Sequence, residues 1–182
     1  MGNLLLFGIF SLLFIVLSWR TLFNASSHGF YRFFSWECII WLQVSNYKFW
    51  FYDPFSFQQI FSWIFLIWSA YVVIAGVLLL KKSGNPRKER IDGMLFEFEK
   101  TSVLVEHGIF RYIRHPLYSS LLFLTWGIFF KNSTFQLVII AILSTVFLYL
   151  TAIFDEKECI AYFGDKYSEY IKRSKMFIPY II

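Results

Sequence analysis

Charged side chains are scarce in this chain of 182 residues, in which Asp, Glu, Lys and Arg make up only 16% of the positions. Soluble domains carry closer to a quarter, about 25%. Hydrophobic residues account for 58% and aromatic residues for 23%, so little water-soluble chain is left for a second domain. The composition predicts an all-α integral membrane protein, because a helix satisfies its own backbone groups where no water is present.

Cysteine is also scarce, since Cys38 and Cys159 are the only two. Their wide separation gives neither a disulfide framework nor the spacing of a metal site, so no metal is predicted. The net charge is +5, but zinc-finger, helix-turn-helix and RNA-binding signatures are missing. We therefore predict no nucleic-acid partner, and we interpret the charge as membrane orientation and contact with anionic membrane lipids.

The chain contains several long apolar runs. A membrane-spanning helix needs roughly 20 apolar residues, and fewer where its ends lie in the interface. The run at 57–80 is the longest, and the run at 36–51 is the weakest because it contains Glu37, Asn46 and Lys48. We predict about five membrane-spanning helices, at residues 4–18, 36–51, 57–80, 117–130 and 135–154.

Basic residues gather in the stretch 81–116 and in the tail after Phe154. Short loops rich in Lys and Arg lie on the cytoplasmic side of membrane proteins. Both stretches are therefore predicted to be cytoplasmic, whereas the N-terminus and the turns at 52–56 and 131–134 face outward. The protein is then a multi-pass membrane protein.

One linker divides the chain, because residues 81–94 combine Gly, Asn and Pro with mixed charges. Residues 1–80 form a predicted three-span N-terminal anchor, and residues 81–94 form a cytoplasmic linker. Residues 95–182 hold most of the sequence signals that point to function.

The strongest of these signals is "RYIRHP", residues 111–116, directly before an apolar run. A residue before proline disfavours the helical region, and proline suits the first turn of a helix. A helix should therefore begin at about Pro116, with Arg114 and His115 at its N-terminal end. Unpaired backbone N–H groups and the positive helix end would favour an anionic group there.

The turn at 131–134 is so short that the fourth and fifth spans must form an antiparallel hairpin. The fifth helix runs on from apolar residues into Asp155 and Glu156 and is predicted to stop at Gly164. The hairpin therefore predicts that His115 and Glu156 lie close together at the cytoplasmic face. A short cytoplasmic helix with Tyr167 and Tyr170 on one face should follow.

Carboxylates, cations, a histidine, a helix N-terminus and several aromatic rings would meet in such a pocket. S-adenosylmethionine suits it, because this zwitterion carries an ammonium, a carboxylate, a ribose diol and a sulfonium that aromatic faces can stabilise. A dinucleotide would also suit cations at a helix N-terminus, and the residue pattern leaves both ligands open.

Each residue also has a simpler explanation. Arg111 and Arg114 can be snorkelling residues at a membrane boundary. Asp155 and Glu156 can be a solvated face beyond the membrane, and His28 is expected in an interfacial loop. The combination of all these residues at one predicted face favours a binding site.

The segments "LVEHGIFRYIRHPLYSS" and "DEKECIAYFGDKYSEYIKRSKMFIP" resemble the integral-membrane methyltransferases of the isoprenylcysteine carboxyl methyltransferase and phospholipid methyltransferase type. The resemblance covers about residues 95–180 and is specific for the superfamily but not for a substrate. It implies S-adenosylmethionine as cofactor and a lipid or lipidated molecule as the methyl acceptor.

The resemblance also implies roles for particular residues. Arg173, Glu156 and His115 would serve catalysis, with Arg173 holding the site together or meeting an anionic acceptor. The residues implied to bind the cofactor are Leu104, Val105, Phe110, His115, Pro116, Leu117, Tyr118, Asp155 and Glu156.

The sequence departs from the family pattern in several places, one of them the acidic pair Asp155-Glu156 where the family often has Glu-Glu, and two alternative functions stay open. Ser120 stands where the family usually has Gly, and residues 151–154 lack the Arg typical of isoprenylcysteine enzymes, which disfavours a prenylcysteine carboxylate as acceptor. The C-terminal part also resembles NADPH-dependent membrane reductases of the sterol reductase type. The second alternative is a non-catalytic membrane protein that keeps the fold.

Overall fold

The computed structural model describes residues 2–85 and 99–181, and over these residues it is helical without any strand. The all-α prediction is confirmed for this part of the chain. An isolated bridge joins Ile113 to Lys175. The helices are α1 (Gly2–Ser18), α2 (His28–Asn46), η1 (Tyr47–Phe49), α3 (Phe57–Ser83), η2 (Gly108–Arg111), α4 (Pro116–Phe129), α5 (Phe135–Phe163) and α6 (Asp165–Arg173).

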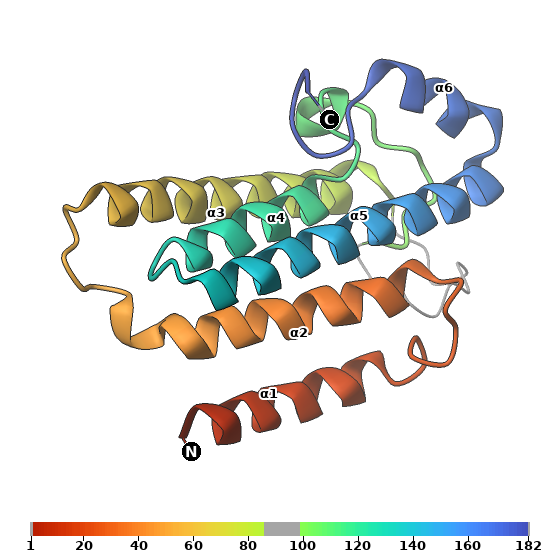
Figure 1. Cartoon of the computed structure of the whole chain (residues 1–182). Coiled ribbons are helices and arrows are strands. Elements are labelled where there is room, and N and C mark those ends of the chain that lie inside the picture. The colour runs from red at the N-terminus through yellow and green to blue at the C-terminus, as the bar shows by residue number, and fades with distance from the viewer. Residues whose placement is uncertain (1, 86–98, 182) are drawn as a thin grey trace.

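Five of these helices, α1 to α5, run side by side in an elongated bundle, and α6 lies with the C-terminal segment at one end of it (Figure 1). α2 packs against α5, α3 against α4, and α1 against α2. The turn between α4 and α5 folds them into the predicted antiparallel hairpin. The end of α5 and the start of α4 therefore lie at the same end of the bundle.

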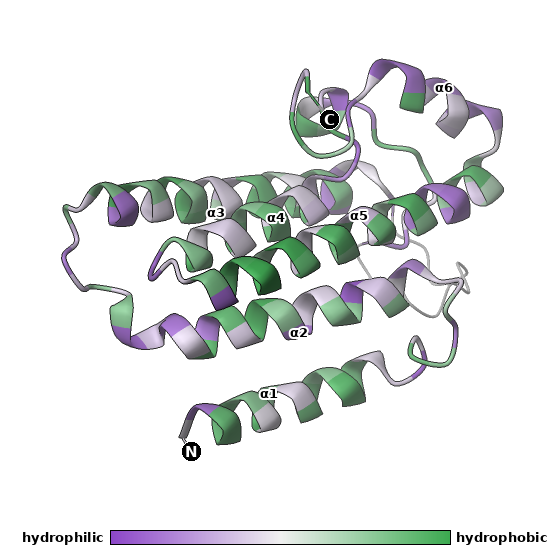
Figure 2. Ribbon diagram, viewed as in Figure 1, coloured by the Kyte–Doolittle hydropathy of each residue, from purple (hydrophilic) through white to green (hydrophobic). Residues whose placement is uncertain are grey.

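Among the described residues, two helices have the length and apolar composition to cross a membrane, α3 and α5. α1 and α4 are apolar but shorter, and α2 mixes polar with apolar residues (Figure 2). Large hydrophobic side chains are exposed along α1 and α3, including Leu5, Val16 and Ile67. The number of spans is therefore shown only as two candidates, and five remains a prediction.

The second helix differs from its predicted position at 36–51. α2 begins at His28, because the Ser27 hydroxyl caps it by accepting a hydrogen bond from the backbone N–H of Gly29. It ends at Asn46, whose side-chain amide donates to the carbonyl of Ile128 in α4 at 2.8 Å. The apolar run alone misplaced this helix by one to two turns, because polar residues of α2 are buried against its neighbours rather than facing water.

Small residues allow the helices to approach closely. The Ser62 and Ser69 hydroxyls of α3 donate to the carbonyls of Gly127 and Ser120 in α4, at 2.6 and 2.7 Å. A side chain at Gly127 would meet Leu66 of α3 at 2.8 Å. Such contacts are typical of helix packing in lipid, where apolar burial gives little drive for association.

Candidate functional site

The site begins where α4 begins. Pro116 is the first residue of α4, as the sequence predicts, and His115 has φ −121° and ψ 62°, outside the helical region. The proline ring of Pro116 disfavours helical backbone geometry at the residue before it, His115. The His115 side chain is thereby turned away from the helix axis and into the bundle, where it is buried.

The C-terminal segment holds this bend in place. The backbone N–H groups of Arg114 and His115 donate to the carbonyls of Lys175 and Met176, at 2.8 and 3.2 Å. Lys175 in turn donates its N–H to the carbonyl of Tyr112 at 3.0 Å. Three backbone bonds between segments about 60 positions apart in sequence therefore determine where His115 sits.

Charged side chains from the segment before α4 and from α5 meet at this bend. The His115 imidazole lies 3.3 Å from Asp155 through Nδ1 and 3.1 Å from Glu156 through Nε2. Arg114 Nε lies 2.5 Å from Glu156 Oε1, and its NH1 donates to the carbonyl of Ser174 at 2.8 Å. The predicted meeting of His115 and Glu156 is therefore present in the fold.

Protonation of the imidazole follows from these contacts. Burial of His115 disfavours the charged ring, but the hydrogen bonds and the negative charges of Asp155 and Glu156 outweigh burial and raise its pKa above the ordinary value of 6.5. The Tyr118 ring stacks on the imidazole, with ring centres 5.4 Å apart. The imidazole ring thus lies between two carboxylates that favour its charged form.

This arrangement predicts a pH dependence of stability. A histidine whose pKa is higher in the folded state stabilises that state fully below the unfolded pKa, and the contribution is lost as pH rises through the folded pKa. The melting temperature of the purified protein in detergent should therefore fall as pH rises above about 6.5.

The check is the same pH series on His115→Asn, which keeps the size and polarity of the side chain but cannot titrate. We expect a flatter dependence in this variant. An equal slope in both proteins would assign the pH dependence to other groups.

A partly open cavity of about 100 Å³ lies beside the imidazole. It is smaller than typical small-molecule sites, which enclose about 300–1,000 Å³. Its lining combines charged, aromatic and aliphatic residues from α3, α4, α5, α6 and the segment before α4. They are Leu80, Glu99, Thr101, Leu104, Val105, Phe110, Arg114, His115, Pro116, Leu117, Tyr118, Asp155, Cys159, Phe163, Tyr167 and Tyr170.

The sequence-predicted residues divide between this lining and its surroundings. All those predicted to contact the cofactor line the cavity except Glu156, which contacts the lining residues Arg114 and His115. Arg173 lies outside as well, more than half exposed, and pairs with Glu106 at 2.5 Å. Their roles as ligands and catalysts stay predictions. Of the acidic residues predicted from the sequence, Asp155 lines the cavity and Glu156 does not.

Four aromatic rings gather at one part of the lining, and we call Phe110, Phe163, Tyr167 and Tyr170 the aromatic wall. The ring of Tyr167 lies 6.4 Å from that of Phe163 and 5.7 Å from that of Tyr170. The Tyr170 hydroxyl donates to the carbonyl of Phe110 at 2.5 Å and so joins α6 to the segment before α4. The prediction that Tyr167 and Tyr170 share one helix face agrees with their burial.

Sequence reasoning missed the contribution of α2. Arg32, which is 6% exposed, pairs with Glu99 of the cavity lining at 3.2 Å. His28, predicted to lie in an interfacial loop, is instead the first residue of α2 and is fully buried, so that prediction is wrong. His28 and Arg32 are four residues apart, so they lie on the same face of a helix. Two basic residues at this spacing in an apolar region were the sequence signal that could have revealed the contribution of α2.

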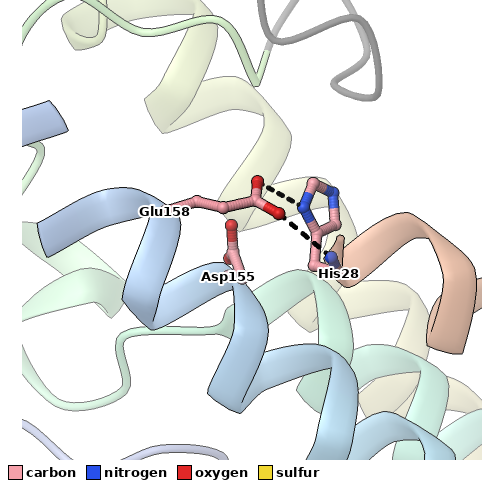
Figure 3. Close-up of side chains that lie close together, drawn as sticks. All are labelled: His28, Asp155 and Glu158. Atoms are coloured by element: carbon pink, nitrogen blue, oxygen red, sulfur yellow. Dashed lines mark hydrogen bonds and ion pairs between the residues drawn. The ribbon is translucent and has the colours of Figure 1, made fainter. Parts of the chain in front are cut away.

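His28 lies beside two carboxylates of α5 (Figure 3). Its Nδ1 and its backbone N–H meet the two oxygens of Glu158, at 2.7 and 3.0 Å, and Asp155 lies next to them. Ligand atoms of the three residues lie within 4.8 Å of one another, which is a spacing a metal ion could use. The two hydrogen bonds account for the proximity, so we interpret the group as a clamp between α2 and α5.

A family model for phospholipid methyltransferases matches residues 58–166, more than half of the chain. The match runs from α3 into the first turn of α6, so it includes the start of α4 and the acidic residues of α5 but neither α1 nor α2. No similar curated protein and no similar solved structure was found.

Proposed function

The chain belongs to the phospholipid methyltransferase family, and we propose that it transfers a methyl group from S-adenosylmethionine to a lipid or lipidated acceptor in the membrane. Family membership indicates a membrane methyltransferase. The observation that carries the finer proposal is the cavity beside His115, in which carboxylates and cations face aromatic rings. These are the partners that an ammonium, a carboxylate, a sulfonium and an adenine require.

One face of the α5 helix runs along the cavity and suggests how the donor is oriented in it. Asp155, Cys159 and Phe163 follow at four-residue intervals and all line the cavity, so they form one face of the helix. Between Asp155 and Phe163 this face rises by about 12 Å. We place the adenine against the aromatic wall and the amino-acid end of the donor near Asp155.

Methyl transfer at this site depends more on aligning the donor and the acceptor than on activating either of them. When bound, S-adenosylmethionine supplies a methyl group on a sulfonium, which passes to an acceptor lone pair and leaves a neutral thioether. The protein's part is to hold both partners in line and to exclude water. The Tyr118 ring and the aliphatic residues Leu104, Val105 and Leu117 supply the apolar surroundings for this.

The acidic residues then have separate tasks. Glu156 positions the imidazole and Arg114 from behind, whereas Asp155 faces the cavity. A carboxylate acceptor is ionised at neutral pH and needs no base. An amine acceptor must lose a proton and would need a base near the transferred methyl group.

The membrane arrangement is part of the same proposal. α1 to α5 all cross the bilayer, with α6 and the cavity on the cytoplasmic side and the acceptor's lipid part entering between helices. The clusters of Lys and Arg at 81–116 and after Phe154 support this orientation. Cysteine labelling at Ser133 in the α4–α5 turn against Lys166 in α6 tests it, with labelling from outside expected only at position 133.

Calorimetry with S-adenosylhomocysteine and with NADP tests the cofactor. We expect the purified protein to bind the first and not the second. Binding of NADP alone would favour a reductase of the sterol reductase type, and binding of neither would favour a non-catalytic membrane protein. The acceptor is then identified by mass spectrometry of membrane lipids and lipidated peptides incubated with methyl-labelled donor, which should gain one methyl mass.

A further inference from the structure

One buried ion pair beside the cavity has no place in the mechanism so far. Arg32 NH1 of α2 lies 3.2 and 3.4 Å from the two oxygens of Glu99, and the two side chains are 7% and 9% exposed. Removing two charges from water costs about as much as their attraction returns, so such a pair is weak evidence for stability. The pair lies beside the cavity, which suggests a role in ligand binding rather than in stability.

Glu99 is a lining residue of the cavity, whereas Arg32 is not. The lining carboxylates are therefore Glu99 and Asp155, which we call the acidic wall, because Glu156 lies behind His115. Arg32 thus holds one carboxylate of the acidic wall from outside the cavity, by two contacts to a single guanidinium nitrogen.

Both acidic residues have a basic partner, since Asp155 lies 3.3 Å from the Nδ1 of His115 and Glu99 pairs with Arg32. They differ in the rest of their surroundings. Glu99 shares its stretch of the lining with Thr101, whose hydroxyl can accept hydrogen bonds. An ammonium group has three donors and needs several acceptors on one side, and the stretch from Glu99 to Thr101 offers them.

We propose that Glu99 binds the α-ammonium group of the methyl donor, and that Arg32 is the positioning residue that holds Glu99 for this contact. The inference rests on the proposed function and names the group that reads the amino-acid end of the donor. α2 lies outside the residues matched by the family model. The N-terminal half of the chain is therefore part of the donor site, in addition to anchoring it.

The test compares two ligands on each protein. S-adenosylhomocysteine carries the ammonium, and its des-amino analogue, S-adenosyl-4-thiobutyrate, lacks it. Wild-type protein should bind the first about tenfold or more tighter by calorimetry, the size expected of a charged hydrogen bond. In Glu99→Gln this preference should fall to about twofold or less, through a loss of affinity for S-adenosylhomocysteine alone.

Glu106→Gln is the matched control. Glu106 lies seven residues further along the same segment, pairs with the exposed Arg173 and does not line the cavity. It loses the same charge, and the ligand preference should stay at the wild-type value. A structural disturbance by Glu99→Gln would weaken both ligands equally and would overturn the inference.

Two further variants examine Arg32. Arg32→Lys keeps the charge but not the planar fork, so part of the preference should remain. The double variant Arg32→Met with Glu99→Met replaces the pair by apolar side chains, which is often neutral for folding. It should elute as the wild type does in detergent, melt within a few degrees of it and show no ligand preference.

The outcomes separate the inference from the function. If wild-type protein fails to bind S-adenosylhomocysteine, the proposed function fails. If it binds and the preference survives in Glu99→Gln or in the double variant, only the inference fails. Loss of the preference in Asp155→Asn while Glu99→Gln retains it would assign the ammonium to Asp155 instead.

Discussion

Asp155→Asn should lower the affinity for S-adenosylmethionine by about 10-fold or more, because it removes one of the two negative charges that line the cavity of a positively charged donor. Asp155 lines the cavity and lies 3.3 Å from His115 Nδ1. The substitution keeps the shape of the side chain, removes a negative charge facing a positive donor and takes one counterion from the imidazole. Calorimetry on the detergent-purified protein measures the effect.

Glu169→Gln serves as the comparison, because Glu169 is an exposed carboxylate of α6 and the change in net charge is the same. Its donor affinity should equal that of the wild type. The assignment of Asp155 to the donor site would be refuted by unchanged affinity in Asp155→Asn, provided that the variant melts as a folded protein.

Arg114→Leu should destabilise the fold by about 1.5–3 kcal/mol, the range for a lost hydrogen bond to a charged group, because the partly buried Glu156 loses its guanidinium partner but keeps His115. Arg114 and Glu156 have side chains that are 10% and 15% exposed, and their charged atoms lie 2.5 Å apart. The substitution also removes the donor to the carbonyl of Ser174. The C-terminal segment should then detach from the start of α4 more readily.

Thermal unfolding and limited proteolysis measure this effect, with cleavage expected first after residue 174. Arg114→Leu combined with Glu156→Leu is the control, since removing both charges avoids a carboxylate that has lost its guanidinium partner and should recover part of the stability. If the single and double variants are equally unstable, packing around Arg114 matters more than its charge.

Local signals in the chain were sufficient for much of the architecture. The apolar runs at 57–80 and 135–154 correspond to α3 and α5, Pro116 begins α4, and Gly164 follows the end of α5 with φ +63°. These features depend on the nearest residues alone: a proline ring, a glycine without Cβ, or an apolar stretch long enough to be helical. The short turn before Phe135 makes α4 and α5 a hairpin. The hairpin brings His115, just before α4, close to Glu156 near the end of α5.

Contacts between distant segments decided the rest. Adjacent residues on a helix differ by about 100° in direction, so the packing of α5 determines that Asp155 faces the cavity while Glu156 faces Arg114. The local sequence pattern does not determine how α5 is rotated about its axis. Likewise, α2 brings Arg32 to Glu99 because α5 and the segment before α4 bury its polar residues. Hydrophobicity along the chain reports which segments become helices, whereas the face that each helix turns inward depends on its neighbours.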